Sequence, residues 1–287
     1  MEVSGVRLTS PDKVLWPTMG VTKLQLAEYF AAEAERILLH VKDRPVSLFR
    51  CPAGVSGDCF FQKHRGKSTP SEIGGTPVRE ASGETKDYIL VETPEALIAC
   101  AQIGALELHV WGARVGDLEQ PERVVFDLDP GEGTDFSDVK TAARDVRDRL
   151  DRIGLASFPM LTGGSGVHVI APLDGKAGWD RVKAFAEDMA RAMEADDPER
   201  YVATSRKDLR KGRIFIDWLR NARGSTGIAP FSPRARKGAP VATPIAWDEL
   251  GKAASGRAYT LATIGKRLSA LKRDPWEGYF DVKQGLG

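Results

Sequence analysis

The sequence predicts a mixed α/β fold, because short apolar runs with strand-like alternation are separated by amphipathic helices. One strand is expected over 124–128 and another over 213–221. A third strand is expected to follow directly after a glycine-rich turn at 163–166. Apolar residues at helical spacing predict helices over 137–153 and 182–193 between those strands. The chain has 287 residues, of which 42% are hydrophobic, so it is long enough to bury a substantial core.

Local signals predict the elements of the remaining chain. Thr22 and Gln25 match a capping box, which predicts that a helix begins there and continues to about Leu39. Residues 68–86 are rich in Gly, Pro, Ser and Thr and are expected to form a loop. The other expected elements are strands over 46–49, 88–91 and 106–111 and helices over 94–103 and 264–271.

The cysteine content indicates a reducing compartment, and the hydropathy indicates a chain without a membrane span. Cys51, Cys59 and Cys100 make an odd count without a paired framework. The N-terminus lacks a basic segment followed by an apolar run, and no stretch approaches the roughly 18 apolar residues that span a bilayer. We therefore expect a soluble, cytoplasmic protein with no membrane partner.

Positive charge is concentrated in one part of the sequence. The chain as a whole has a formal net charge of +1, yet residues 200–240 contain eleven Lys or Arg against two Asp. Such segregation indicates a surface that attracts a polyanion, the alternative being an ordinary solvated face.

Three aspartates in apolar strands are candidate metal ligands. Asp127 and Asp129 alternate with Phe126 and Leu128, so both carboxylates point to one face of the expected strand. Paired carboxylates select hard divalent ions, although an ordinary strand running into an acidic turn is the alternative. Asp217 lies in another apolar strand, where a carboxylate is costly unless it is paired or metal-bound.

Other segments are suited to phosphates and bases. The turn at 163–166 exposes backbone amides that can hold phosphate oxygens, and His168 projects from the strand that follows. Phe60 and Phe61 precede a basic run and could stack on bases, unless one Phe is core and the cations are solvated. His109 on the 106–111 strand is, on its residue type alone, more typical of a structural histidine.

Taken in order, these segments resemble the archaeo-eukaryotic primase superfamily, and specifically the polymerase domain of bacterial DNA ligase D of non-homologous end joining. The resemblance implies a single two-lobed domain over 1–287 with a central cleft and an RRM-like catalytic sheet. The matching segments are 10–17, 50–52, 60–64, 127–130, 215–221, 229–232 and 234–236.

The resemblance also implies a role for individual residues. The metal ligands would be Asp127, Asp129 and Asp217, holding two Mn²⁺ or Mg²⁺ ions. The other implied roles are active-site residues (His109, Arg220), contacts to the incoming nucleotide (Thr162, Ser165, His168, Arg220, Arg234, Arg236), 5′-phosphate binding (Lys13, Lys23) and template stacking (Phe60, Phe61). Ser165 departs from the pattern, since the family usually carries Lys or Arg there, and weaker nucleotide binding or compensation from Lys211 or Arg213 is expected.

The implied activity is template-directed nucleotide addition that fills gaps and extends DNA ends in double-strand break repair. By resemblance the enzyme would prefer ribonucleotides and manganese, could add untemplated nucleotides, and would act on gapped or broken DNA carrying a 5′-phosphate. It would use NTP or dNTP, work beside Ku and an ATP-dependent DNA ligase, and associate with the nucleoid.

Three alternatives compete with the polymerase. A polymerase-β-type nucleotidyltransferase has its Gly-Ser turn before the carboxylates, whereas here the turn follows them. A haloacid-dehalogenase-type phosphatase needs Thr or Val where this chain has Gly131. The third alternative, a non-catalytic DNA-end-binding module with a degenerate site, would be expected to lack part of the aspartate triad, and all three aspartates are present.

Overall fold

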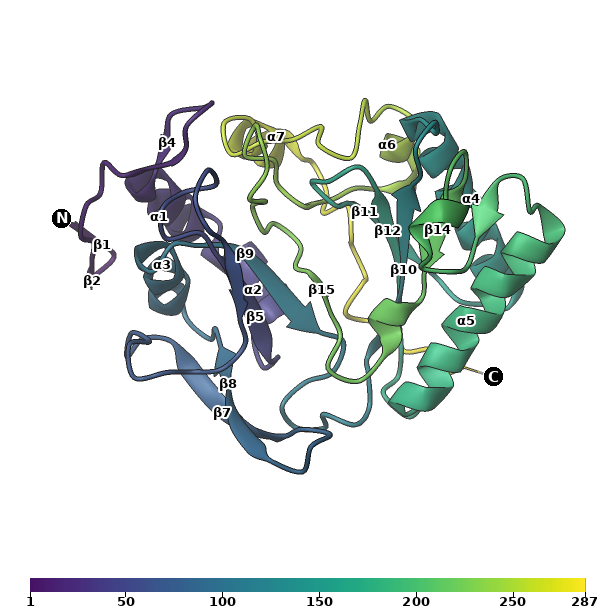
Figure 1. Ribbon diagram of the computed structural model, residues 1–287, viewed down its shortest axis with the longest axis horizontal. Helices are drawn as coiled ribbons and strands as arrows, with labels where there is room; N and C mark the ends of the chain where they lie inside the picture. The colour runs from purple at the N-terminus through teal and green to yellow at the C-terminus, as the bar shows by residue number, and fades with distance from the viewer. Residues whose placement is uncertain (287) are drawn as a thin grey trace. The chain divides into compact units, whose positions relative to one another are not determined.

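A computed structural model describes residues 1–286 and divides the chain into two compact units, each interrupted in sequence. Unit 1 comprises Met1–Trp111, Ile228–Ala242 and Tyr259–Lys266, and unit 2 comprises Gly112–Gly227, Thr243–Ala258 and the C-terminal segment from Arg267 (Figure 1). The mixed α/β class predicted from the sequence is confirmed. Within the described residues, no helix has the length and apolar character needed to cross a membrane.

Unit 2 is built on a six-stranded sheet with the strand order β13-β14-β10-β12-β11-β16. Its first part follows the chain order β10, α4, β11, β12, α5, β14, and β10 pairs in antiparallel fashion with both β12 and β14. This βαββαβ connectivity is the ferredoxin-like arrangement that RRM domains also use, as the resemblance implied. The strands are β10 (Arg123–Pro130), β11 (Phe158–Leu161), β12 (Val167–Pro172), β13 (Tyr201–Val202), β14 (Ile214–Asp217) and β16 (Thr243–Pro244).

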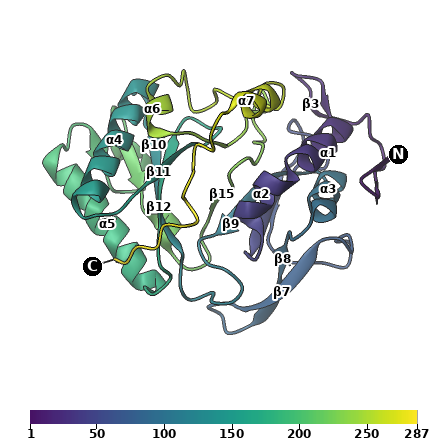
Figure 2. The ribbon, with the colours of Figure 1, turned by 180° about the vertical axis from the view of Figure 1, so that it is seen from behind.

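The two long helices of unit 2 cover one face of this sheet. α4 (Phe136–Arg152) begins at a capping box formed by Asp135 and Asp138, and α5 (Trp179–Asp196) follows β12. Both lie against the sheet in opposite views (Figures 1 and 2). The Phe126 and Phe185 rings, 6.5 Å apart between centroids, join β10 to α5. Because side chains alternate along a strand, Asp127 and Asp129 point to the other face.

Unit 1 contains a second, mostly antiparallel sheet whose main strands follow the order β9-β5-β8-β7, with β6 also paired to β5. The Thr22 hydroxyl caps α1 at Gln25 as predicted, but the helix expected to reach Leu39 is interrupted at Glu33. The elements are β1 (Glu2–Val3), β2 (Val6–Arg7), β3 (Val14–Trp16), β4 (Val21–Thr22), α1 (Lys23–Ala32), α2 (Ala34–Val41), β5 (Val46–Arg50), β6 (Phe60–Gln62), β7 (Gly74–Arg79), β8 (Thr85–Leu90), α3 (Pro94–Gln102) and β9 (Ala105–Trp111).

The remaining elements are short. The chain returns toward unit 1 through β15 (Thr226–Ile228), and the predicted C-terminal helix is α7 (Ile264–Ala270). α6 (Trp247–Leu250) and the 3₁₀ turns η1 (Lys207–Leu209) and η2 (Leu219–Asn221) complete the set.

Two further sequence-based expectations about backbone structure were wrong. The stretch 68–86, expected to be loop, contains β7, which pairs with β8 from Gly74 opposite Leu90 to Arg79 opposite Thr85. The strand expected to reach residue 221 ends at Asp217, because Trp218 has helical backbone angles and begins a 3₁₀ turn.

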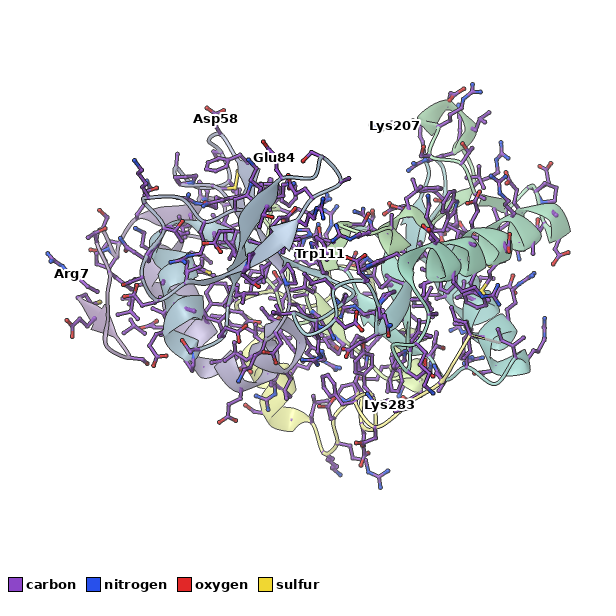
Figure 3. All side chains as sticks on the ribbon, turned by 90° about the horizontal axis from the view of Figure 1, so that it is seen from below. Arg7, Asp58, Glu84, Trp111, Lys207 and Lys283 are labelled. Carbon is purple, nitrogen blue, oxygen red and sulfur yellow. A yellow bond between two sulfur atoms is a disulfide. The ribbon has the colours of Figure 1, made fainter. Side chains whose placement is uncertain are left out.

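The expectation that the cysteines are unpaired was also wrong. Cys51, directly after β5, and Cys59, directly before β6, form a disulfide, while Cys100 is free and buried. The bond lies beside Asp58 (Figure 3). Arg50 pairs directly with Phe60, so the register of the two strands brings the neighbouring cysteines together.

Candidate active site

The centre of the site is a row of polar side chains across three adjacent strands of unit 2. Asp127 on β10 is directly opposite His168 on β12 and directly opposite Asp217 on β14. Opposed residues of antiparallel strands project on the same face. The row is buried, with Asp127, His168 and Asp217 exposed by 6%, 4% and 8%. Asp129, two positions after Asp127, adds a fourth polar group on that face.

Two cationic or potentially cationic side chains contact the central aspartate. His168 Nε2 lies 3.2 Å from Asp127 Oδ1, and Arg220 Nε lies 3.3 Å from Asp127 Oδ2. The same Arg220 Nε is 3.2 Å from Asp217 Oδ2, so one guanidinium spans two of the three aspartates.

Asn221 explains how Arg220 reaches this place. After β14 ends, the Asn221 side chain accepts a hydrogen bond from the Val125 amide and donates one to the Val125 carbonyl, each 2.8 Å long. Its amide also donates to the Trp218 carbonyl, and the side chain is almost fully buried. The amide thereby continues the pairing along β10 and fixes η2, which carries Arg220. Asn221 lies in the matching segment 215–221, but the sequence alone did not predict a role for it.

Burial and the proximity of the carboxylates shift the pKa values of the row. The nearby Asp127 carboxylate, followed by burial, raises the pKa of Asp129 to about 6. Burial, followed by the charge of Asp127, raises the pKa of Asp217, although Arg220 opposes this shift. Burial would lower the pKa of Arg220, but the three aspartates outweigh it and raise that pKa. The surroundings of Asp129 and Asp217 therefore disfavour their ionised forms, and a nearby positive charge would favour them.

The aspartates do not by themselves converge on one point. Across residues 1–286, no group of three or more His, Cys, Asp or Glu side chains is placed to hold one metal ion. The carboxylates of Asp127 and Asp217 instead face the Arg220 guanidinium, and Asp217 Oδ1 accepts a hydrogen bond from the Leu219 amide.

The glycine turn borders the acidic row. It connects β11 to β12, and the Thr162 hydroxyl donates to the Gly166 carbonyl and accepts from the Gly164 amide. Gly166 is required by packing, since a Cβ there would lie 2.3 Å from the Leu128 carbonyl oxygen. Thr162 is buried and braces the turn, whereas Ser165 is exposed at its tip.

The basic window of the sequence is divided between the two units. In unit 2, Arg210 stacks over the Phe215 ring at 3.7 Å, and the segment before β14 packs against the Gly131 backbone. Lys207 projects from the tip of this segment (Figure 3). In unit 1, the Arg236 amide donates to the Arg234 carbonyl, which closes a turn over these residues. The basic residues of the window therefore do not all belong to one unit.

Unit 1 gathers a second cluster around the buried carboxylate of Glu107. Glu107 Oε2 lies 2.8 Å from His109 Nε2 and 3.0 Å from Arg234 Nε, and Oε1 accepts the Ala235 amide at 2.8 Å. Burial would raise the pKa of Glu107, but the His109, Arg234 and Ala235 contacts lower it to about 2. Two predicted site residues, His109 and Arg234, are thus brought together by one that sequence reasoning missed.

The predicted stacking aromatics lie on the strand β6. Phe60 and Phe61 are 46% and 58% exposed, which is high for side chains of this size. Phe61 packs on Phe49 and meets His109 edge-on, with centroids 5.1 Å apart. Arg50 stacks on Phe60 and donates to Gln62, so the hairpin holds both rings at its surface.

The two predicted 5′-phosphate lysines are neighbours in unit 1. The Lys23 amide donates to the Lys13 carbonyl, and Lys23 Nζ donates to the Thr9 carbonyl at 2.8 Å. Burial, together with the charge of Lys13, lowers the pKa of Lys23. Unneutralised neighbouring ammonium groups are suited to an anion.

An RRM-like sheet with aspartates and a histidine on the face away from its helices, bordered by a glycine turn, is the arrangement of primase-type polymerases. A family model described as "LigD, primase-polymerase domain" matches residues 22–276. The chain belongs to this family. The resemblance inferred from the sequence is therefore confirmed.

Individual relatives agree with this assignment. The chain is 36% identical over 285 residues to the multifunctional non-homologous end joining protein LigD of Pseudomonas aeruginosa, covering 99% of this chain and 34% of that protein. It is 37% identical over 247 residues to the corresponding protein of Mycolicibacterium smegmatis, covering 85% of this chain and 32% of the relative. The chain thus spans about a third of the length of these relatives.

A solved structure shares the fold. The polymerase domain of Mycobacterium tuberculosis ligase D, in complex with DNA, superposes with a TM-score of 0.88 at 35% identity. The superposition covers 96% of this chain and 97% of that chain.

Proposed function

We propose that this protein is a metal-dependent, template-directed nucleotidyltransferase that fills gaps and extends DNA ends in non-homologous end joining. The observation that carries the proposal is the row formed by Asp127, His168 and Asp217, with Asp129 beside it, on a sheet of the primase-polymerase class. The relatives' names and the DNA in the related structure support the same conclusion.

The donor set suits hard divalent cations. All three ligands would be carboxylates, which Mn²⁺ and Mg²⁺ prefer, and the raised pKa values of Asp129 and Asp217 express an unmet demand for positive charge. Asp127, Asp129 and Asp217 would hold two ions once Arg220 turned away from the carboxylates. Such ions would supply charge neutralisation for the attacking hydroxyl and for the leaving pyrophosphate.

The remaining residues would bind and orient the nucleotide and the DNA. The turn braced by Thr162 presents Ser165 and backbone amides to phosphate oxygens, beside His168. Arg220, released from the aspartates, would pair with the triphosphate, as would Arg234 and Arg236. His109 would act in the active site. Lys13 and Lys23 would bind the 5′-phosphate across a gap, and Phe60 and Phe61 would stack on template bases.

Finer features of the activity follow from the family. We propose a preference for ribonucleotides and manganese, a capacity for untemplated addition, and work beside Ku and an ATP-dependent DNA ligase at broken ends. Exposed Phe60 and Phe61 support the DNA contact, because a large exposed aromatic pair is otherwise unfavourable.

Primer extension on a gapped duplex tests the proposal. The substrate carries a labelled primer and a downstream 5′-phosphate, and the assay compares NTP with dNTP and Mn²⁺ with Mg²⁺. We expect extension by wild type, weaker extension without the 5′-phosphate, and the same weakening from Lys13→Ala. DNA binding without extension under any metal would instead support a non-catalytic end-binding module.

A further inference from the structure

The Glu107 cluster of unit 1 has a geometry that surface ion pairs lack. The Glu107 side chain is 6% exposed, and its two partners His109 and Arg234 are 12% and 13% exposed. Three donors converge on its two oxygens, one of them a backbone amide from the turn that carries Arg234. Buried carboxylates with this many donors hold their partners in one arrangement.

We propose that Glu107 is a positioning residue that fixes His109 and Arg234 as one preformed unit for nucleotide binding. The inference rests on the proposed polymerase function, which places both partners at the active site. Glu107 and His109 occupy alternate positions of β9 and so share a face, while Arg234 comes from a segment 127 residues further along the chain. A single carboxylate therefore joins two distant parts of the sequence.

The chemistry of the cluster assigns the proton on His109. An ionised carboxylate only accepts hydrogen bonds, so the 2.8 Å contact requires His109 Nε2 to be the donor. His109 is thereby held as the Nε2–H tautomer when neutral, with its ring orientation also limited by the edge contact to Phe61. On Arg234, the bond uses Nε and so fixes the plane of the guanidinium.

Glu107→Gln is the most informative substitution. The amide keeps the shape of the side chain, but its NH₂ group must face either the Ala235 N–H or the two donors His109 and Arg234. Either orientation places two donors against each other. We expect the His109 tautomer to change or become mixed, and the KM for nucleotide to rise about tenfold with a smaller change in kcat.

Ring ¹⁵N NMR of selectively labelled protein measures the tautomer directly, without DNA or nucleotide. The chain has four histidines, so the spectrum is simple. Glu80→Gln is the matched control, because Glu80 contacts His64 Nε2 at 3.1 Å in the same unit. The Glu80→Gln substitution should shift the ¹⁵N signals of His64 and leave those of His109 unchanged.

The outcomes separate this inference from the proposed polymerase activity. An altered His109 tautomer in Glu107→Gln, with a raised nucleotide KM, supports the positioning role of Glu107. An unchanged tautomer, or a nucleotide KM within twofold of wild type, overturns it even when wild type is an active polymerase. Should Glu107→Gln fail to fold, the wild-type spectrum decides, since neutral His109 protonated only at Nδ1 would contradict the assignment.

Discussion

The two polar clusters of the molecule surround their buried carboxylates differently, and the pKa values of those carboxylates shift in opposite directions. In unit 1, Glu107 is surrounded by donors, and its pKa falls to about 2. In unit 2, Asp129 and Asp217 lie beside Asp127, and the pKa of Asp129 rises to about 6. The contacts of Glu107 favour its ionised form, whereas the three neighbouring aspartates of the second cluster lie near Arg220 and His168 and repel one another. The second cluster is the one in which a bound cation would lower the electrostatic cost of ionised carboxylates.

Removing an aspartate from the row should have the largest effect. We expect Asp129→Asn to reduce primer extension at least about 1,000-fold, because one carboxylate ligand is lost where charge must be neutralised. The rate of nucleotide addition under saturating Mn²⁺ measures this. Asp135→Asn is a matched control, since Asp135 caps α4 outside the row. Equal extension by Asp129→Asn and wild type would exclude the assigned site.

The disulfide gives a test confined to unit 1. Cys51 and Cys59 are separated by eight positions, and releasing this loop in Cys59→Ser should lower the free energy of unfolding by about 2 kcal/mol. Urea unfolding measures the loss, with wild type under reducing conditions as the comparison. Mn²⁺ binding should not change, because the aspartate row belongs to unit 2. A matching loss of Mn²⁺ binding would show that the aspartate row is not independent of the Cys51–Cys59 disulfide.

The pH dependence should separate the clusters. Asp129, with a pKa raised to about 6, takes up a proton as the pH falls below 6, so its contribution to Mn²⁺ binding is lost there. Calorimetry should find binding about tenfold weaker at pH 5 than at pH 7. Glu107 has a pKa lowered to about 2, so its stabilising contacts persist at pH 5 and are lost only as the pH falls from about 4.5 toward 2. Binding that does not weaken between pH 7 and 5 would contradict the shift on Asp129.

Adding a cation at the glycine turn should have a smaller effect. Ser165 is exposed at the tip of the turn, at the position where the resemblance led us to expect a basic residue. We expect Ser165→Lys to tighten nucleotide binding about fivefold, since an exposed ammonium gains a modest, salt-screened interaction with phosphate. Fluorescence titration with a labelled nucleotide measures it, and Ser165→Gln controls for side-chain size. An unchanged affinity in Ser165→Lys would show that this prediction is wrong.

Much of unit 2 could be predicted from the sequence because its signals are local. The alternation of apolar and polar residues around Asp127 predicted that its carboxylate and that of Asp129 lie on the same face of the strand. Helical periodicity predicted the positions of α4 and α5. The register that places His168 and Asp217 on either side of Asp127 could not be read from any one segment, since it depends on pairing between strands distant in sequence.

The errors share a physical cause. β7 contains two glycines and a proline, which disfavour a strand, yet pairing with β8 overrides that preference. The Cys51–Cys59 bond depends on the register of β5 and β6, which the spacing of the cysteines does not reveal. Glu107 was missed because its partner Arg234 lies 127 residues away, although its place two residues before His109 on one strand was a usable signal.

Thermal unfolding with and without Mn²⁺ tests most directly whether repulsion among the ionised aspartates destabilises the row until a cation binds. The folded-state pKa of Asp129 exceeds its usual value, so ionised Asp129 destabilises the metal-free protein at pH 7. We predict that metal-free Asp129→Asn unfolds about 2–4 °C above wild type, and that Mn²⁺ raises the midpoint of wild type much more than that of the variant. A metal-free variant less stable than wild type, with an equal Mn²⁺ response, would contradict the account.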